Sequence, residues 1–546
     1  MNKYIKMAAG VVTLAIVASC TKLDQNLNST LTSQQTANAL GAAFVLQNAY
    51  NDVGNPYSDP GNVFALEEVT ADECLIPTRA GDWDDNGKWR ALHQHNWSVD
   101  GVDIFLNMFN ALNKITFDAT NVLTPDFKAT KEQIAEARFI RAIALYQIFD
   151  LWGQFPFRPP ADNLLNAPKV YRGDSAVQFI ISELNAVIPD LSAGNTISQA
   201  NVDAANFLLM RLYLNHGAFV NRQSPTFSDA DMQKVITLGN AIINSGKYGY
   251  SSNFFDNFNP SNSTSKEIIF ASPNTAGVVT NNTGIHNMWW STSHYNQYFS
   301  HYGSQGGWNG FSTVADFYNS FGVTVPMTRT PNDTLIDPRI GGRYYKGATD
   351  QSGIRPGILI GQQYDEKGNK LTDRKNNLLI FDPNIAPDLK ENGANLELTG
   401  YRIAKYVPDF SNNGKNYNGT AGNWCVLFRY PDVVLMVAEA MMRQAAPNNA
   451  GALALVNSLR AARGTTAMTS MILNDATNVY APNTLLAERG REMYWESVRR
   501  TDLIRFGMFL KPWAYKSASG DVKNLLYPIP TASLAANPNL KQNDGY

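Results

Sequence analysis

Aromatic and uncharged polar side chains gather between Trp289 and Tyr318. Ten of these 30 residues are aromatic, where the average of the whole chain, 11%, would give about three. A sugar ring has an apolar C–H face that can lie flat on an aromatic ring, and a rim of hydroxyl groups that needs hydrogen-bond partners. Because Asp316 is the only formally charged residue of the stretch, its composition predicts binding of a neutral sugar. Rings such as Phe317 are expected in the core instead. The candidates for ligand contact here are Trp289, Trp290, Tyr298, Trp308 and Asn309.

A second stretch, from Asp72 to Trp97, sets tryptophans among charged residues and glycines. The guanidinium of Arg79 offers a planar fork of donors that suits adjacent hydroxyl groups, and the aspartates nearby offer acceptors. The alternative is a solvated acidic turn whose tryptophans are structural. The candidates for ligand contact in this stretch are Asp72, Arg79, Asp82, Trp83 and Trp89.

Catalytic motifs are sparse. Glycoside hydrolysis needs two carboxyl groups at a defined separation, and although acids such as Glu67, Glu68 and Glu73 are plentiful, none forms a recognisable acid/base motif. The chain has no Gly-x-Ser-x-Gly, His-Glu-x-x-His or P-loop pattern. The sequence therefore favours a binding protein over an enzyme. A secreted α-helical glycoside hydrolase remains the enzymatic alternative.

Metal-binding patterns are equally incomplete, and no metal or cofactor is predicted. His93 and His95 would share one face of a strand, but no third ligand is evident, so a structural role is expected for both. The run Asp82–Gly87 is rich in oxygen ligands, yet it lacks the spacing and the terminal Glu of an EF-hand calcium loop.

The N-terminus has the pattern of an export signal. Lys3 and Lys6 precede an uncharged run, Met7–Ser19, that is too short to span a bilayer but has the length of a signal-peptide core. Val17-Ala18-Ser19-Cys20 resembles a bacterial lipobox, in which cleavage follows residue 19 and the cysteine is lipidated. We therefore expect residues 1–19 to be a leader and Cys20 to carry a lipid anchor. An ordinary secretory signal is the alternative.

The mature chain that would begin at Cys20 carries a formal charge of −4, because the leader removes two lysines from 45 basic and 47 acidic residues. Such a chain lacks the basic field that nucleic-acid binding requires. Cys74 and Cys425 are left for a disulfide, which an exported protein could form. A chain of this length does not need one, so their state stays open.

Helical periodicity supplies the elements that must position these candidates. Apolar residues recur every three or four positions over 132–152, and similar segments follow at about 174–190, 203–218 and 230–246. Their connections are polar and rich in Gly and Pro, which favours antiparallel pairs like tetratricopeptide (TPR) repeats. Three more helices are predicted over 432–444, 450–462 and 485–506. Pro431, Gly464 and Gly507 provide their boundaries.

Residues 251–425 differ from these helical blocks. They are rich in Asn, Gly, Ser and Thr and offer only short strand candidates, such as Glu397–Val407. Long irregular segments in a compact protein usually carry function. The predicted fold is mostly α, a TPR-like helical scaffold with a large irregular ligand-binding part and a few short strands. The predicted organisation is a leader (1–19), an N-terminal helical region (20–250), the irregular binding region (251–425) and a C-terminal helical region (426–546).

Several motifs, in order along the chain, resemble those of the SusD/RagB family. They are EARFIRAIALYQIFDLWGQFPF (Glu136–Phe157), FRYPDVVLMVAEA (Phe428–Ala440), NSLRAARG (Asn457–Gly464), ERGREMYWESVRRTDLIRF (Glu488–Phe506) and the terminal YPIPTASLAANPNLKQNDGY. Trp308–Phe311 and the segment after Pro77 also resemble family positions. In many glycan-binding members, the equivalents of Arg79, Asp82 and Trp83 line the sugar site, although Ala80 stands where the pattern often has Gly.

The resemblance implies a right-handed superhelix and a surface-exposed lipoprotein of the outer membrane. Such a protein would capture an oligosaccharide or polysaccharide for a SusC-like TonB-dependent transporter, without catalysis. The scaffold would face the transporter, and the loops would hold the sugar. A structural lid that binds no glycan is a further alternative, and neither the glycan nor its linkage is predicted. The charged residues of the strongest motifs are expected to tie helices together through ion pairs; they are Arg429, Asp432, Glu439, Glu488, Arg491, Glu492 and Asp502.

Overall fold

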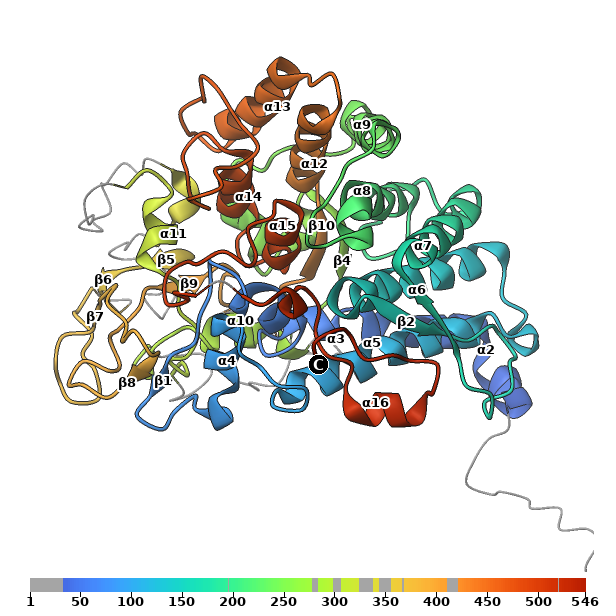
Figure 1. Cartoon of the computed structure of the whole chain (residues 1–546), viewed down its shortest axis with the longest axis horizontal. Coiled ribbons are helices and arrows are strands. Elements are labelled where there is room, and N and C mark those ends of the chain that lie inside the picture. Colours follow the sequence, from blue (N-terminus) through green and yellow to red (C-terminus); the bar gives the residue numbers. More distant parts are fainter. Residues whose placement is uncertain are drawn as a thin grey trace, which may run out of the picture.

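The chain folds into a helical half and a loop-rich half (Figure 1). In the computed structural model, residues 33–546 are described except for 195, 277–282, 298–305, 324–336, 343–354, 366–367, 410–420 and 519. The predicted fold class, mostly α with a large irregular part and a few short strands, is confirmed. Among the described residues, no helix has both the length and the apolar character to cross a membrane.

Eight helices stack side by side in an arc along the helical half (Figure 1). Consecutive members of the arc pack against each other, as expected of TPR-like pairs. The first two, α2 and α5, are not among the helices predicted above. In packing order the helices are α2 (Ser33–Val53), α5 (Asp103–Val122), α6 (Lys131–Trp152), α7 (Gly173–Val187), α8 (Val202–Val220), α9 (Asp229–Asn244), α12 (Tyr430–Arg443) and α13 (Asn449–Ala462).

Helix α6 shows how the sequence sets the boundaries of this arc. Thr130 and Gln133 form a capping box at its start, in which each side chain bonds to the other's backbone N–H. Gly153, with φ of 69°, ends it in the left-handed conformation that glycine adopts without strain. Nearly all residues from Ala135 onward are buried, because α5, α7 and α2 cover the helix.

The single long helix predicted over 485–506 is wrong. The chain forms two helices there, α14 (Leu485–Met493) and α15 (Arg499–Arg505), separated by residues with positive φ at Trp495 and Ser497. This break turns Glu496 toward two buried cations, Lys405 and Arg429, with N–O distances of 2.6 Å to each. The ion pairs explain why strong helical periodicity does not continue as one helix.

A buried ion cluster joins the C-terminal helices to the loop-rich half. Arg429 donates to Glu267 and Glu492 at 2.9 and 2.8 Å, and Arg463 bonds to the same two carboxylates. Arg339 extends the cluster to Glu488 at 2.9 Å. The prediction of scaffold ion pairs is confirmed, because all seven motif residues are buried and paired. We define the buried ion cluster as Glu267, Arg339, Lys405, Arg429, Arg463, Glu488, Glu492 and Glu496.

These pairs predict a loss of stability in acid. Burial alone would raise the pKa values of Glu439 and Glu492, but the arginines around them hold both at about 2, below the usual 4.5. A carboxyl group whose pKa is lowered by folding stabilises the protein above pH 4.5, and that contribution is lost as the pH falls toward 2. We expect the free energy of unfolding, measured by urea titration, to fall over this range, with a shallower slope in Glu439→Gln. An equal slope in both proteins would contradict this assignment.

The described residues form five two-stranded sheets. One of them, β2 (Gln154–Phe157) with β3 (Lys169–Arg172), packs against α6 and α7 in the helical half. Another pair, β4 with β10, connects the loop-rich half to the start of α12. The strand predicted over Glu397–Val407 exists only in part, as β9 (Arg402–Ala404). The other strands are β1 (Thr78–Arg79), β4 (Ile268–Ser272), β5 (Gly357–Leu359), β6 (Gly361–Gln362), β7 (Ile380–Phe381), β8 (Lys390–Glu391) and β10 (Cys425–Arg429). The remaining helices are α3 (Asn55–Ser58), α4 (Lys88–Gln94), α10 (Asn287–Trp290), α11 (Ala315–Asn319) and α16 (Thr531–Ala536).

The two cysteines whose state the sequence left open are both free thiols. Cys74 and Cys425 are buried, and no disulfide joins them. Burial raises the pKa of each thiol, to about 12 for Cys425, so both stay protonated at neutral pH. The fold therefore depends on its apolar core and ion pairs.

Candidate functional site

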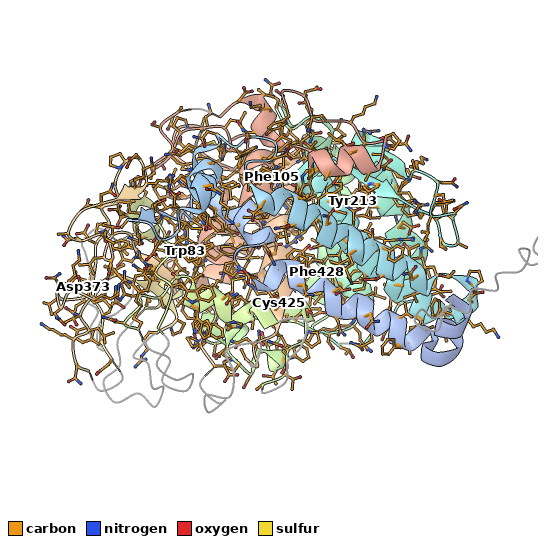
Figure 2. All side chains as sticks on the ribbon, turned by 90° about the horizontal axis from the view of Figure 1, so that it is seen from below. Trp83, Phe105, Tyr213, Asp373, Cys425 and Phe428 are labelled. Carbon is orange, nitrogen blue, oxygen red and sulfur yellow. The ribbon has the colours of Figure 1, made fainter. Side chains whose placement is uncertain are left out.

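Two tryptophans that lie far apart in the sequence meet on the surface of the loop-rich half. The indole Nε1 of Trp83 donates to the backbone oxygen of Trp308 at 2.8 Å. Trp83 is half-buried and Trp308 is 36% exposed, so both rings keep surface available to a ligand. Figure 2 labels Trp83 in this half, away from Tyr213 of α8. We call Trp83, Tyr295 and Trp308 the aromatic platform.

Packing underneath fixes the orientation of these rings. Trp83 meets Phe311 edge-on, with ring centroids 5.6 Å apart, and Trp308 stands on buried Trp290 at the same centroid distance. A Cβ atom at Gly310 would come within 2.3 Å of the Trp83 ring. Glycine at this position is therefore required for the ring to lie against the backbone.

The third ring carries a polar rim. The hydroxyl of Tyr295 donates to Asp82 at 2.5 Å, and the guanidinium of Arg374 lies 3.8 Å from the centre of the Tyr295 ring. About half of each of the Asp82 and Arg374 side chains is exposed. The platform thus combines flat rings with accessible donors and acceptors, which is the composition that a sugar requires.

Buried groups behind the rim set its charge. Arg374 donates to Glu397 at 2.7 Å, and His294 contacts the same carboxylate at 3.0 Å. The Nδ1 atom of His294 accepts from the backbone N–H of Asn296, so the proton lies on Nε2 and is donated to Glu397. Burial lowers the pKa of His294 to about 4, which keeps the imidazole neutral at neutral pH. Burial alone would raise the pKa of Glu397, but the hydrogen bonds from Arg374 and His294 lower it, so this carboxyl is ionised.

Arg79 and Arg402 connect the Trp308 loop to the segment 396–400 through hydrogen bonds. Arg79 donates to the backbone oxygens of Asn309 and Thr399 at 2.9 and 2.8 Å, and Arg402 donates to the side chain of Asn309 at 2.9 Å. Both guanidinium groups are completely or almost completely buried. Their role is to hold the platform in place.

A model of the SusD family matches residues 266–546, more than half of the chain. The chain belongs to the SusD family. The resemblance read from its motifs is thereby confirmed, and the matched SusD-family region contains the Tyr295 and Trp308 part of the platform.

Two relatives extend the comparison along the chain. The starch-binding protein SusD of Bacteroides thetaiotaomicron is 25% identical over 506 residues, which cover 88% of this chain and 85% of that protein. The SusD-like protein P38 of Formosa agariphila is 31% identical over 130 residues, which cover 22% of this chain and 24% of that protein. The first of these alignments covers more of the chain than the family model does.

Solved structures show the same fold. Surface glycan-binding protein A from Bacteroides thetaiotaomicron, in complex with laminarihexaose, superposes with a TM-score of 0.64 at 15% identity over 92% of this chain and 98% of that chain. A SusD superfamily protein from Parabacteroides distasonis superposes with a TM-score of 0.65 at 18% identity over 95% and 100%. The helical arc and the loop-rich half are thus the SusD fold.

Of the ligand-contact candidates, Asp82, Trp83 and Trp308 come together at the surface, whereas six others are buried. The expectation that Trp289, Trp290 and Trp89 expose their rings is wrong, because their side chains are buried in the core. Asn309 is buried as well and accepts from Arg402. Asp72 pairs with Arg499 at 2.7 Å. Tyr298 and the lipidation candidate Cys20 lie outside the described residues.

The prediction that Arg79 contacts the sugar is also wrong, because its donors are occupied by backbone and hydroxyl oxygens. The glycine that the family pattern often has in place of Ala80 also has a physical explanation. Ala80 adopts a φ of 60°, which glycine takes without strain, so the glycine of the family pattern suits this turn.

Sequence reasoning missed Arg374 and Glu397 as parts of the site. Both lie in a segment of ordinary polar composition, 60 or more residues after Trp308, and no local motif marks them. Tyr295 is one of the ten aromatic residues between Trp289 and Tyr318, and its sequence neighbours do not distinguish it from the others. Its partner Asp82 comes from a different segment, so only the folded chain reveals their pairing.

The histidine pair has the structural role that was expected of it. His93 and His95 are buried in and after α4, and their ring nitrogens bond to backbone oxygens of Cys74 and Thr70, among others. The Asp82–Gly87 run is committed to protein contacts too, since Asp84 pairs with Arg90 at 2.9 Å and Asp85 accepts from Trp89 at 2.6 Å. Within the described part of the chain, no cluster of three or more His, Cys, Asp or Glu residues could hold a metal ion.

The role of Arg79 in connecting the Trp308 loop to the segment 396–400 can be tested by substitution. Arg79→Ala removes the buried guanidinium and leaves the oxygens that it bonded without this partner. We therefore expect the free energy of unfolding in urea to fall by about 2–3 kcal/mol. The near-ultraviolet circular dichroism of the tryptophans should change with it. Lys88→Ala, which breaks a pair with the exposed Asp103, is the control, with an expected change within about 1 kcal/mol. An Arg79→Ala protein as stable as the control would contradict this role of Arg79.

Proposed function

We propose that this SusD-family chain is a glycan-binding protein that captures an oligosaccharide or polysaccharide without cleaving it. The observation that carries the proposal is the pairing of Trp83 and Trp308 at one surface. Their rings offer apolar faces to sugar C–H groups, while Asp82 and Arg374 offer hydrogen bonds at the edge. The names of relatives support the same class of ligand, since one binds starch and another is in complex with laminarihexaose.

The charge of the site favours a neutral glycan. The positive charge of Arg374 is balanced by Glu397, and the exposed carboxylate of Asp82 would repel an acidic sugar. His294 adds no charge because its pKa is about 4. Screening the soluble chain from Thr21 onward against neutral and uronic-acid glycans tests this class. Preference for acidic glycans would contradict it.

Absence of turnover is the second part of the proposal. Both acids of the site are engaged, Asp82 by Tyr295 and Glu397 by Arg374 and His294, whereas a glycosidase needs carboxyl groups placed around a scissile bond. Incubating the purified chain with the glycan that it binds and assaying new reducing ends separates the alternatives. Activity that survives repurification would favour the glycoside hydrolase.

The predicted leader and the family support a proposal for the cellular setting. We place the mature chain on the outer membrane, anchored through lipid on Cys20 and exposed at the cell surface, where it hands its glycan to a SusC-like TonB-dependent transporter. A structural lid that binds no glycan would need the transporter but not the platform. Co-purification with the transporter, measured together with glycan affinity, distinguishes these roles.

A further inference from the structure

A cavity of about 590 Å³ lies on the helical half, between α2, α5 and the loop that joins β2 to β3. Figure 1 shows α2 and β2 on the opposite side of the molecule from β1, which precedes Trp83. The described residues that line this cavity include none of the aromatic platform. Its volume is within the range of small-molecule sites. The helical half therefore has a cavity of its own, separate from the candidate site above.

Four phenylalanine side chains line this cavity: Phe44, Phe117, Phe127 and Phe157. Phe44 and Phe117 are each 48% exposed, although they belong to helices that pack against each other. Their rings are not used up by the contact between the helices and keep apolar faces for a ligand. The C–H face of a sugar ring is one kind of surface that covers an aromatic face of this kind.

Asparagines add hydrogen-bonding groups to the same cavity. Asn48 of α2 and Asn121 of α5 both line it, and neither side chain has a hydrogen-bond partner among the described residues. Asn113 donates through Nδ2 to the backbone oxygen of Phe109 at 2.7 Å, which leaves its Oδ1 atom as an acceptor. A carboxamide carries both donors and an acceptor, so it can bond to a hydroxyl group in either direction.

Arg141 makes part of the wall a polar one. Its side chain is buried, and within the described part of the chain its Nε atom has no hydrogen-bond partner. The guanidinium carbon lies 5.0 Å from the centre of the Phe157 ring. A buried donor without a partner costs free energy. This wall therefore favours a ligand that carries oxygen atoms over a hydrocarbon.

The formal charges at the cavity cancel. Arg141 and Arg158 bring two positive charges to the lining, and Asp118 and Asp162 bring two negative ones. Each of them is also paired within the protein. The ion pairs are Arg158–Asp162 at 3.1 Å, Asp118–Lys114 at 2.6 Å and Arg141–Glu183. An anionic or cationic ligand would meet no unbalanced charge here, so the lining favours a neutral one.

The backbone around the cavity offers little to a peptide. Pro156, Pro159 and Pro168 line it, and proline has no N–H group. The backbone groups of α2 and α5 are bonded within each helix. An extended peptide would leave its own backbone groups without partners, at a cost in free energy. A sugar needs only the side-chain amides and the aromatic faces.

We propose that this cavity is a second saccharide site, which takes a neutral oligosaccharide against Phe44 and Phe117 with hydrogen bonds from Asn48 and Asn121. The class of ligand rests on the proposed function, in which the platform binds a neutral glycan, but the two sites can fail separately. Two sites on one chain raise the apparent affinity for a polysaccharide that reaches both, because the second contact becomes intramolecular.

The test uses the chain from Thr21 onward with Trp83→Ala and Trp308→Ala together, which removes the platform. We expect saturation-transfer NMR to detect residual binding of at least one neutral oligosaccharide among laminarihexaose, maltohexaose, mannohexaose and xylohexaose. Adding Phe44→Ala with Phe117→Ala should weaken this binding by about tenfold or more, because truncating an aromatic contact residue typically costs at least that factor. Ile472→Ala with Val522→Ala, at residues 57% and 47% exposed, is the matched control and should leave the residual binding unchanged.

No residual binding of any of these oligosaccharides would overturn the inference, and so would equal binding by the phenylalanine variant and the control. Circular dichroism melting checks that each variant is folded, and Trp308→Ala alone serves if the chain without both tryptophans is not. A failure of the platform has a different result. The tryptophan substitutions would then leave the affinity of the chain unchanged, while Phe44→Ala with Phe117→Ala would still lower it.

Discussion

Trp308→Ala is expected to weaken binding of the preferred oligosaccharide by about 30-fold or more. Truncating a central aromatic residue of a binding surface typically costs at least 2 kcal/mol. Trp308 is 36% exposed and its backbone is held by Arg79 through Asn309, so the variant should fold normally. Isothermal titration calorimetry with the glycan from the screen measures the change.

Trp83→Ala should show a different combination of effects. Its ring also packs against Phe311 and covers Gly310, so this variant should lose both affinity and several degrees of melting temperature. Tyr213→Ala, on α8 in the other half of the molecule, is the control that should leave affinity unchanged (Figure 2). Unchanged affinity in both tryptophan variants would mean that the glycan binds elsewhere, and would contradict the role of the aromatic platform.

Sequence periodicity was a good guide to the helical arc because its signals are local. The capping box at Thr130 and the glycine at 153 lie within one turn of the ends that they define. The prediction of one helix over 485–506 was wrong because the signal that breaks this helix is not local. Its break depends on Glu496 reaching Lys405, 91 residues earlier in the chain, and no window of neighbouring residues contains that information.

The site was predictable in composition but not in detail. Aromatic enrichment marked two segments that the fold brings together, since Trp83 donates to the backbone of Trp308. It could not tell an exposed ring from a buried one, because Trp290 and Trp308 have the same local character and one supports the other. Arg79 shows the same limit. A guanidinium suits a sugar hydroxyl and a backbone oxygen equally well, and only the fold decides which it meets.

The buried ion cluster leads to the largest expected change in stability. Arg429→Ala should lower the free energy of unfolding by about 3–5 kcal/mol, because removal of one partner of a buried pair leaves uncompensated charge. Arg429 contacts Glu267, Glu492 and Glu496 and is 1% exposed. Urea titration measures the loss. Lys88→Ala, which breaks a pair with the exposed Asp103, is the control and should cost at most about 1 kcal/mol.

The same variant should respond to pH in a way that identifies the cause. Arg429 is one of the arginines that hold the pKa of Glu492 at about 2, so without it this pKa rises in the folded protein. The folded variant then takes up a proton at a higher pH than the unmodified chain does, so part of the stability lost at pH 7 should be regained as the pH falls to about 5. A cavity left by the missing side chain would not titrate. A stability difference from the unmodified chain that stays constant between pH 7 and 5 would therefore assign the loss to packing, and the cluster would then join the two halves by shape and not by charge.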